Sequence, residues 1–149
     1  MSDKFILLVE DNPNDVALTQ MALRKCRVPN KLTVVWNGEE ALDFLFSRGK
    51  YADRDHGQNP ALILLDLKIP CLSGLDVLKQ IRANEKTCSV PVVILTSSVE
   101  ENDRKESIHL GANSFFVKPI RFDEFIELIQ QLSSKWLDLS QMQSDFQKD

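Results

Sequence analysis

Five short runs of mainly apolar residues recur along the chain, and each run leads into a polar segment. The runs cover residues 5–9, 32–36, 61–65, 90–95 and 114–117. Runs of this length that are bounded by polar residues or proline are typical of strands buried on both faces of a parallel sheet. The pattern therefore predicts five buried strands.

The segments between these runs carry the signals of helices. Asn12 and Pro13 predict the start of the first helix, because Asn accepts backbone hydrogen bonds at a helix start and Pro suits the first helical position. Apolar residues at helical spacing are expected to face the core. For this helix they are Leu18, Met21, Ala22 and Cys26.

Four more helices are predicted, over residues 39–47, 75–84 and 100–110 and from residue 122 onward. Residues 100–110 are so polar that this helix should be weakly anchored. The last helix has a long apolar stripe, formed by Phe122, Phe125, Ile126, Ile129, Leu132 and Trp136. Residues 48–59 are rich in Gly and polar residues, which predicts a long surface loop.

Alternation of strands and helices predicts an α/β fold with a doubly wound parallel sheet. For five short units the flavodoxin-like (βα)5 arrangement, with strand order 2-1-3-4-5, is expected. The 149 residues suit one domain. We assign residues 1–138 to it, expect a polar tail over residues 139–149, and expect no output domain.

The composition narrows the classes of partner. A net charge of −4, with Lys and Arg scattered along the chain, argues against nucleic acid or membrane partners. Neither a signal peptide nor a membrane-length apolar stretch is found. Cys26, Cys71 and Cys88 lack the paired spacing of a zinc site and are interpreted as reduced thiols, which favours a cytoplasmic location.

Candidate chemistry gathers where the predicted strands end. The first run leads into Glu10 and Asp11, the third into Asp66, the fourth into Thr96 and the fifth into Lys118. Right-handed crossovers place the carboxyl ends of parallel strands on one edge of the sheet. In the predicted strand order the three carboxylates converge on the crevice between strands one and three.

This combination of groups has a chemical logic. Three carboxylates at close range favour a bound cation, and oxygen ligands without His or Cys favour Mg²⁺. The Thr96 hydroxyl and the Lys118 ammonium suit an anion beside the metal, for which a phosphoryl group is the natural candidate. Asp66 could then act as a nucleophile that forms an aspartyl phosphate. Each residue alone would be a weak signal, and the conjunction carries the prediction.

The sequence resembles the receiver domains of two-component response regulators over residues 4–137. The residues that carry the resemblance are Glu10, Asp11, Asp66, Pro70, Gly74, Thr96, Lys118 and Pro119. It implies that Asp66 is the phosphoacceptor and that Glu10 and Asp11 are an acidic pair for Mg²⁺. It also implies that the backbone carbonyl of Lys68 is a further metal ligand.

The same resemblance assigns the remaining site residues. Thr96 corresponds to the switch hydroxyl, Lys118 to the phosphoryl-binding lysine and Phe115 to the switch aromatic residue. It also implies a cis Lys118–Pro119 bond, which proline makes accessible. Phe115 stands where chemotaxis-type receivers have tyrosine, so a switch here would work by burial of the ring.

Softer features narrow the resemblance to single-domain regulators paired with cyanobacterial and bacterial phytochromes. They are the acidic start at residues 9–15, the extended loop over residues 51–60 and the expected lack of an output domain. The resemblance implies a histidine kinase of phytochrome type as phosphodonor. Phe122 and Phe125 exceed what a single buried stripe needs, which predicts a homodimer through the fourth helix, fifth strand and fifth helix.

Two alternatives come from other functional classes. A small phosphohydrolase with an aspartate nucleophile needs a second Asp two residues after the first, where this chain has Lys68. A flavodoxin-like cofactor module needs glycines in its first turn, and residues 11–15 are acidic and contain none. The sequence therefore favours a phosphoacceptor signalling protein over an enzyme.

Overall fold

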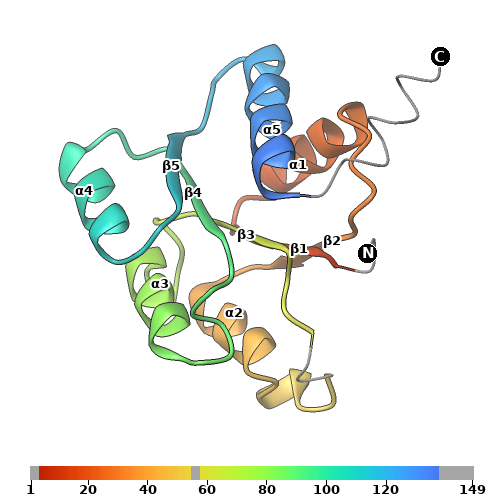
Figure 1. Ribbon diagram of the computed structural model, residues 1–149. Coiled ribbons are helices and arrows are strands. Elements are labelled where there is room, and N and C mark those ends of the chain that lie inside the picture. The colour runs from red at the N-terminus through yellow and green to blue at the C-terminus, as the bar shows by residue number, and fades with distance from the viewer. Residues whose placement is uncertain (1–3, 55–57, 138–149) are drawn as a thin grey trace.

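The computed structural model describes residues 4–54 and 58–137, in which helices cover both faces of one sheet (Figure 1). The strands pair in parallel in the order β2-β1-β3-β4-β5, which confirms the predicted topology. They are β1 (Ile6–Val9), β2 (Leu32–Val35), β3 (Leu62–Leu65), β4 (Val92–Thr96) and β5 (Ser114–Val117).

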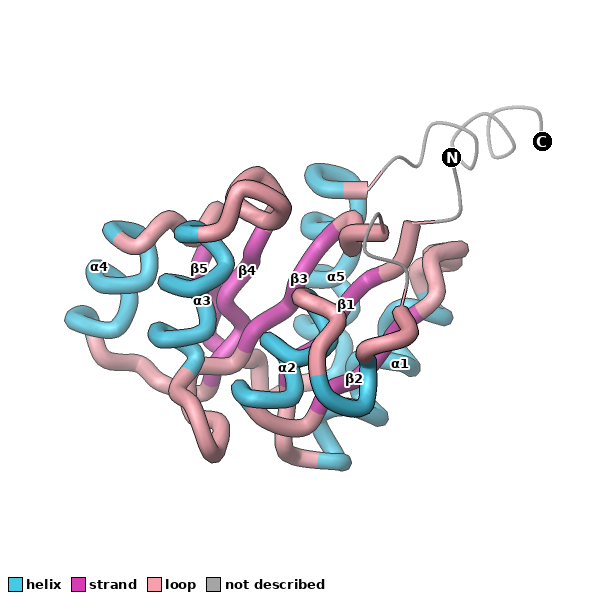
Figure 2. The backbone as a smooth tube through the Cα atoms, turned by 90° about the horizontal axis from the view of Figure 1, so that it is seen from below, coloured by secondary structure: helices cyan, strands magenta, loops and turns pink. Residues whose placement is uncertain are grey.

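The helices form the two outer layers. They are α1 (Pro13–Lys25), α2 (Gly38–Leu45), α3 (Gly74–Ala83), α4 (Glu101–His109) and α5 (Phe122–Trp136). Helices α1 and α5 cover one face of the sheet, and α2, α3 and α4 lie on the other (Figures 1 and 2). Crossovers of one hand produce this arrangement, because a parallel sheet must bury both of its faces.

The central strands explain why their sequence is apolar at every position. In β1, Leu7 and Val9 point into the core beneath α2 and α3, whereas Ile6 and Leu8 point into the core beneath α1 and α5. All four side chains are almost fully buried. A strand with hydrophobic cores on both faces has no solvent side, so it shows no alternation of polar and apolar residues.

Local side-chain caps start three of the helices. The Asn12 side chain accepts from the backbone N–H of Asn14 at 2.8 Å, at the start of α1. Asn37 caps α2 in the same way, and Ser73 caps α3. These bonds satisfy N–H groups that have no partner inside a helix, so short-range sequence signals could place the helix starts.

The predicted inner face of α1 is partly wrong. The buried residues of α1 are Val16, Thr19, Ala22 and Leu23. Met21, expected inside, is 48% exposed, and Leu18 is only half-buried. Thr19 can enter the apolar face because its hydroxyl donates to the Asp15 carbonyl at 2.8 Å. A buried hydroxyl that bonds back to its own helix leaves no apolar signature in the sequence.

Two further expectations are corrected. The structure has no cis peptide bond within residues 4–54 and 58–137, so Lys118–Pro119 is trans, the isomer that most X–Pro bonds adopt. Phe125 is buried in the core, and Phe122 packs against the same cluster. The last helix thus uses these two rings to pack against the sheet, so they do not provide the dimer surface expected from the sequence. The polar tail at residues 139–149 lies outside the described residues.

Helix α4 is weakly anchored, as predicted. Ser107 is its one buried residue, and Ile108 is 45% exposed. In the part of the chain that the structure describes, none of the helices has the length and hydropathy to cross a membrane.

Gly74 has no room for a side chain. A Cβ atom there would lie 2.4 Å from the Asp66 carbonyl oxygen and 2.6 Å from the Leu67 Cα atom. Both are backbone atoms of the segment that follows β3, so α3 begins in direct contact with the segment that holds Asp66.

Gly74→Ala should therefore displace the residues after β3 and lower the free energy of unfolding by about 1–3 kcal/mol. Urea denaturation would measure this loss. Lys79→Ala, at an exposed position of the same helix, is the matched control and should change stability by less than about 0.5 kcal/mol. Equal stability of the two variants would contradict the close contact.

Candidate functional site

Extension of the sheet beyond its strands positions the candidate residues. The backbone N–H of Glu10 donates to the Val35 carbonyl at 3.1 Å, and that of Asp66 donates to the Val9 carbonyl at 3.2 Å. At the far side, the Lys118 N–H donates to the Thr96 carbonyl at 2.7 Å. The residues that end the strands are thus held by the same backbone ladder that orders the core.

The Lys118 ammonium is the centre of the site. It lies 2.7 Å from Asp15 Oδ2 and 2.9 Å from Asp66 Oδ2, and it also donates to Glu10 Oε2. Glu10 and Asp66 are buried, and 11% of the Lys118 side chain is exposed. One lysine therefore connects the ends of β1, β3 and β5 to the first turn of α1.

The second oxygen of each buried carboxylate has a backbone partner. Glu10 Oε1 accepts from the Asn12 N–H at 3.1 Å, and Asp66 Oδ1 accepts from the Lys68 N–H at 3.1 Å. These bonds fix the orientation of both carboxylates, so their outer oxygens converge on the ammonium.

The buried charges shift each other's proton affinity. Burial raises the pKa of Glu10 to about 7, although the hydrogen bond and charge of Lys118 act to lower it. Burial lowers the pKa of Lys118, but the hydrogen bonds that its ammonium donates to Asp15, Asp66 and Glu10 outweigh burial and raise this pKa overall. One ammonium does not neutralise three carboxylates, so the site favours either a proton or a further cation.

A cation fits beside the ammonium. Glu10, Asp11 and Asp66 each offer a carboxylate oxygen, and these oxygens lie within 4.8 Å of one another. Asp11 is exposed, so the group opens to solvent on one side. A hard divalent ion with carboxylate and water ligands suits this donor set. The prediction that these three residues share one site agrees with their placement.

Thr96 lies on the opposite side of Asp66, at the end of the neighbouring strand. Its side chain is fully buried, and its hydroxyl oxygen accepts from the Ser98 N–H at 3.3 Å. Phe115 pairs with Ile94 across β4 and β5, and its half-buried ring packs against the core under α2 and α3. Both residues thus lie where the sequence predicted them.

Asp15 was not among the predicted site residues. It lies in the first turn of α1, where an acidic residue commonly complements the helix dipole. That role hides its contact with Lys118, which is 103 residues away in sequence. The available signal was its position four residues after Asp11, which places both carboxylates near the same end of the helix.

With this geometry established, comparison with known proteins identifies the family. The profile of the response regulator receiver domain matches residues 6–130. The chain belongs to this family. Its strand order and helix arrangement are those of a receiver domain of two-component response regulators.

Among the relatives of this receiver domain is response regulator Rcp1 of Synechocystis sp., which is 35% identical over 91% of this chain and 90% of its own. The Mn²⁺-bound structure of Rcp1 superposes with a TM-score of 0.82, covering 91% of this chain and 95% of that one.

Two other solved structures are similar. The phosphorylated cyanobacterial phytochrome response regulator RcpA has a TM-score of 0.83 and 34% identity, covering 91% of this chain and 95% of its own. The bacteriophytochrome response regulator AtBRR has a TM-score of 0.74 and 47% identity, covering 89% and 94%.

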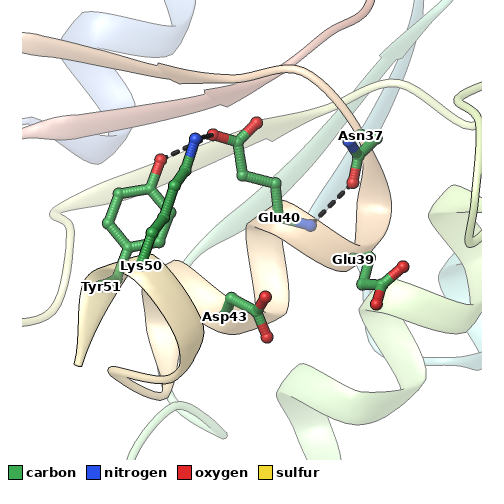
Figure 3. Close-up of a pocket in the computed structure, with 6 residues that line it drawn as sticks. All are labelled: Asn37, Glu39, Glu40, Asp43, Lys50 and Tyr51. Atoms are coloured by element: carbon green, nitrogen blue, oxygen red, sulfur yellow. Dashed lines mark hydrogen bonds and ion pairs between the residues drawn. The ribbon is translucent and has the colours of Figure 1, made fainter.

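A pocket of about 380 Å³ lies between α2 and the loop that follows it (Figure 3). In this loop, predicted to lack regular structure, Gly49–Tyr51 forms a 3-10 turn. Glu40 Oε2 accepts from the Tyr51 hydroxyl at 2.6 Å and lies 3.0 Å from Lys50 Nζ. These contacts attach the start of the loop to α2, and the pocket is interpreted as a product of this attachment.

The raised pKa of Glu10 predicts a pH dependence of stability. In metal-free protein, Glu10 has a pKa of 4.5 in the unfolded chain and of about 7 in the folded state. Between these two pH values the folded state therefore keeps a proton that the unfolded chain has lost. The free energy of unfolding from this group therefore falls as pH rises through that window and levels off above it. Between pH 5 and pH 8, the wild-type protein should lose on the order of 2 kcal/mol of its free energy of unfolding through this group. The Glu10→Gln variant should not show this loss.

Urea denaturation in a chelator, at several pH values, would measure this difference. Glu127→Gln, on the exposed side of α5, is the control and should keep the wild-type slope. Parallel stability curves for wild type and Glu10→Gln would contradict the assignment.

Proposed function

We propose that the protein accepts a phosphoryl group on Asp66 from the phosphohistidine of a histidine kinase and signals through changed protein contacts. The observation that supports the proposal is the position of Asp66 between a lysine and two further carboxylates. Its Oδ2 atom lies 2.9 Å from Lys118 Nζ, and a carboxylate oxygen lies within 4.8 Å of those of Glu10 and Asp11.

In the proposed transfer, an Asp66 oxygen attacks phosphorus in line with the bond to the histidine nitrogen. The new O–P bond forms as the N–P bond breaks, and the electron pair of the N–P bond returns to the imidazole nitrogen. The Lys118 ammonium, held by Glu10 and Asp15, stabilises charge on the phosphoryl oxygens. Lys118 also pairs with Asp66, so it must move from the carboxylate to the incoming group.

Glu10, Asp11 and Asp66 would hold Mg²⁺, with the backbone carbonyl of Lys68 as a further ligand. The bound ion would neutralise negative charge on the transferring group. Two relatives support a divalent ion at such a site. Rcp1 has been solved in a Mn²⁺-bound form, and a receiver domain of the Pseudomonas aeruginosa sensor kinase PA1611 has a magnesium ion in its active site cleft.

Output would pass through Thr96 and Phe115. The Thr96 hydroxyl would turn toward the phosphoryl oxygens, and the half-buried Phe115 ring would move further into the core. Such a shift changes the surface of α4, β5 and α5, which present the contacts to other proteins.

A phytochrome-type kinase in the cytoplasm is the phosphodonor that we propose. The support is the similarity to RcpA and AtBRR, which are a cyanobacterial phytochrome response regulator and a bacteriophytochrome response regulator. A preference of this protein for such a kinase over unrelated histidine kinases, in a phosphotransfer profile, would be the expected result.

Asp66→Asn should lower uptake of phosphoryl label from a phosphorylated histidine kinase by more than about 100-fold, because the amide is not a nucleophile. Chelation of Mg²⁺ should abolish uptake by the wild-type protein. Asp53→Asn, at an exposed acidic residue of the loop after α2, should leave uptake unchanged.

Label on Asp66→Asn, or uptake by wild type in a chelator, would overturn the proposed role. A phosphatase assay on the wild-type protein distinguishes the signalling function from the enzymatic alternative. Multiple turnover on a generic phosphomonoester would favour a phosphohydrolase, and we expect none because Lys68 occupies the position of the second aspartate.

We propose further that the protein forms a homodimer through the face of α4, β5 and α5. Three exposed apolar residues support this dimer: Ile108, Val117 and Ile120, which are 45%, 42% and 101% exposed. The two helices of this face carry charges of both signs: Arg104 and Lys105 lie on α4, and Asp123 and Glu124 lie on α5. A two-fold axis can pair such a mixed surface with itself.

Ile120→Glu should weaken this dimer by at least about tenfold, since it places a charge at an apolar contact. Sedimentation of wild type and variant at micromolar concentration would measure the change. Met21→Glu, at an exposed apolar residue of α1, should leave association unchanged. A wild-type protein that sediments only as a monomer would rule out the dimer.

A further inference from the structure

Asp103, in the first turn of α4, makes two contacts that reach away from its own helix. Its Oδ2 atom accepts from the Ser98 hydroxyl at 2.5 Å and lies 3.8 Å from Lys68 Nζ. Its side chain is 14% exposed, although its neighbours on α4 are mostly exposed. A single carboxylate thus bridges the loop after β4 and the loop after β3.

Each partner of Asp103 is bonded in turn to a residue of the proposed phosphoryl site. The Ser98 N–H donates to the Thr96 hydroxyl oxygen at 3.3 Å. The Lys68 N–H donates to Asp66 Oδ1 at 3.1 Å. Asp103 is therefore linked to Thr96 through Ser98 and to Asp66 through Lys68. These contacts connect α4 to Thr96 and Asp66.

The first turn of α4 lacks the side-chain cap on the N-cap residue that starts α1, α2 and α3. Ser107 is the one buried residue of α4. The N-cap residue of this helix, Glu100, makes no side-chain cap bond. The Ser98 hydroxyl instead accepts from the Glu100 N–H at 3.4 Å while it donates to Asp103. The two contacts together fix Ser98 between the end of β4 and the helix.

We propose that Asp103 is a positioning residue that holds the β4–α4 loop in its unphosphorylated position. This inference rests on the proposed function of Asp66. To engage a phosphoryl group, the Thr96 hydroxyl must turn from the Ser98 N–H toward Asp66. Ser98 resists that movement as long as its hydroxyl is bonded to Asp103, so the bridge stabilises the conformation that cannot bind the phosphoryl oxygens through Thr96.

A contact present in only one of two conformations shifts the equilibrium between them. If the bridge belongs to the unphosphorylated conformation, its removal should increase affinity for a phosphoryl analogue. A charge-assisted hydrogen bond of this kind corresponds to about a five- to tenfold change in affinity. A residue that only supported the fold would give unchanged or weaker binding when it is removed.

Calorimetric titration of the full chain with beryllium trifluoride in Mg²⁺, a mimic of a carboxylate-bound phosphoryl group, tests the inference. Asp103→Ala should bind about five- to tenfold more tightly than wild type. Ser98→Ala should produce a similar gain, and the double variant should gain no more than the larger single effect. Glu106→Gln, at an exposed acidic residue of α4, should bind as wild type does.

Asp103→Asn keeps the fold testable if the alanine variant does not fold. Its amide oxygen can still accept from Ser98, but it loses the charge that faces Lys68. We expect a smaller gain, of about two- to threefold, because Lys68 is largely exposed and its ion pair is screened.

The outcomes separate the two proposals. If wild type binds beryllium trifluoride but folded Asp103 variants bind equally or more weakly, the role of Asp103 is wrong and that of Asp66 stands. If wild type does not bind it in Mg²⁺, the proposed phosphoryl site fails, and the positioning role fails with it.

Discussion

One buried ammonium organises the functional edge of this protein. Lys118 donates to Glu10, Asp15 and Asp66, which come from the ends of two strands and from the first turn of α1. Buried carboxylates are costly unless they are paired, so this lysine allows Glu10 and Asp66 to be buried side by side at the strand ends. The site still keeps an excess of negative charge, because one ammonium faces three carboxylates.

The protein places this charge on a rigid sheet and its proposed output on a weak helix. The strands β1, β3 and β4 are buried on both faces, and the backbone ladder continues through Glu10, Asp66 and Lys118. Helix α4 has one buried residue, so few interactions oppose its movement. A local change in charge at the sheet can therefore have its largest effect at α4 and the adjacent β5, at small cost to the core.

Membership of the receiver family agrees with both parts of this arrangement. The match covers the sheet, all five helices up to residue 130 and the acidic edge. Relatives with bound Mn²⁺ or in the phosphorylated state share the fold at TM-scores of 0.82 and 0.83. The function proposed for this chain therefore rests on a shared framework and on its own site geometry, in which Lys118 already contacts the candidate phosphoacceptor.

The sequence by itself determined the elements and the edge on which the site lies. Apolar runs marked the strands, and Asn12 with Pro13 marked the start of the first helix, because both signals follow from short-range chemistry. Parallel topology then brought the strand ends together on one edge. Only the tertiary structure decided that Thr19 is buried while Met21 is exposed, that Asp15 contacts Lys118, and that Asp103 contacts Ser98 and Lys68. Those outcomes depend on the rotation of a helix against the sheet and on contacts between distant segments, which no local pattern specifies.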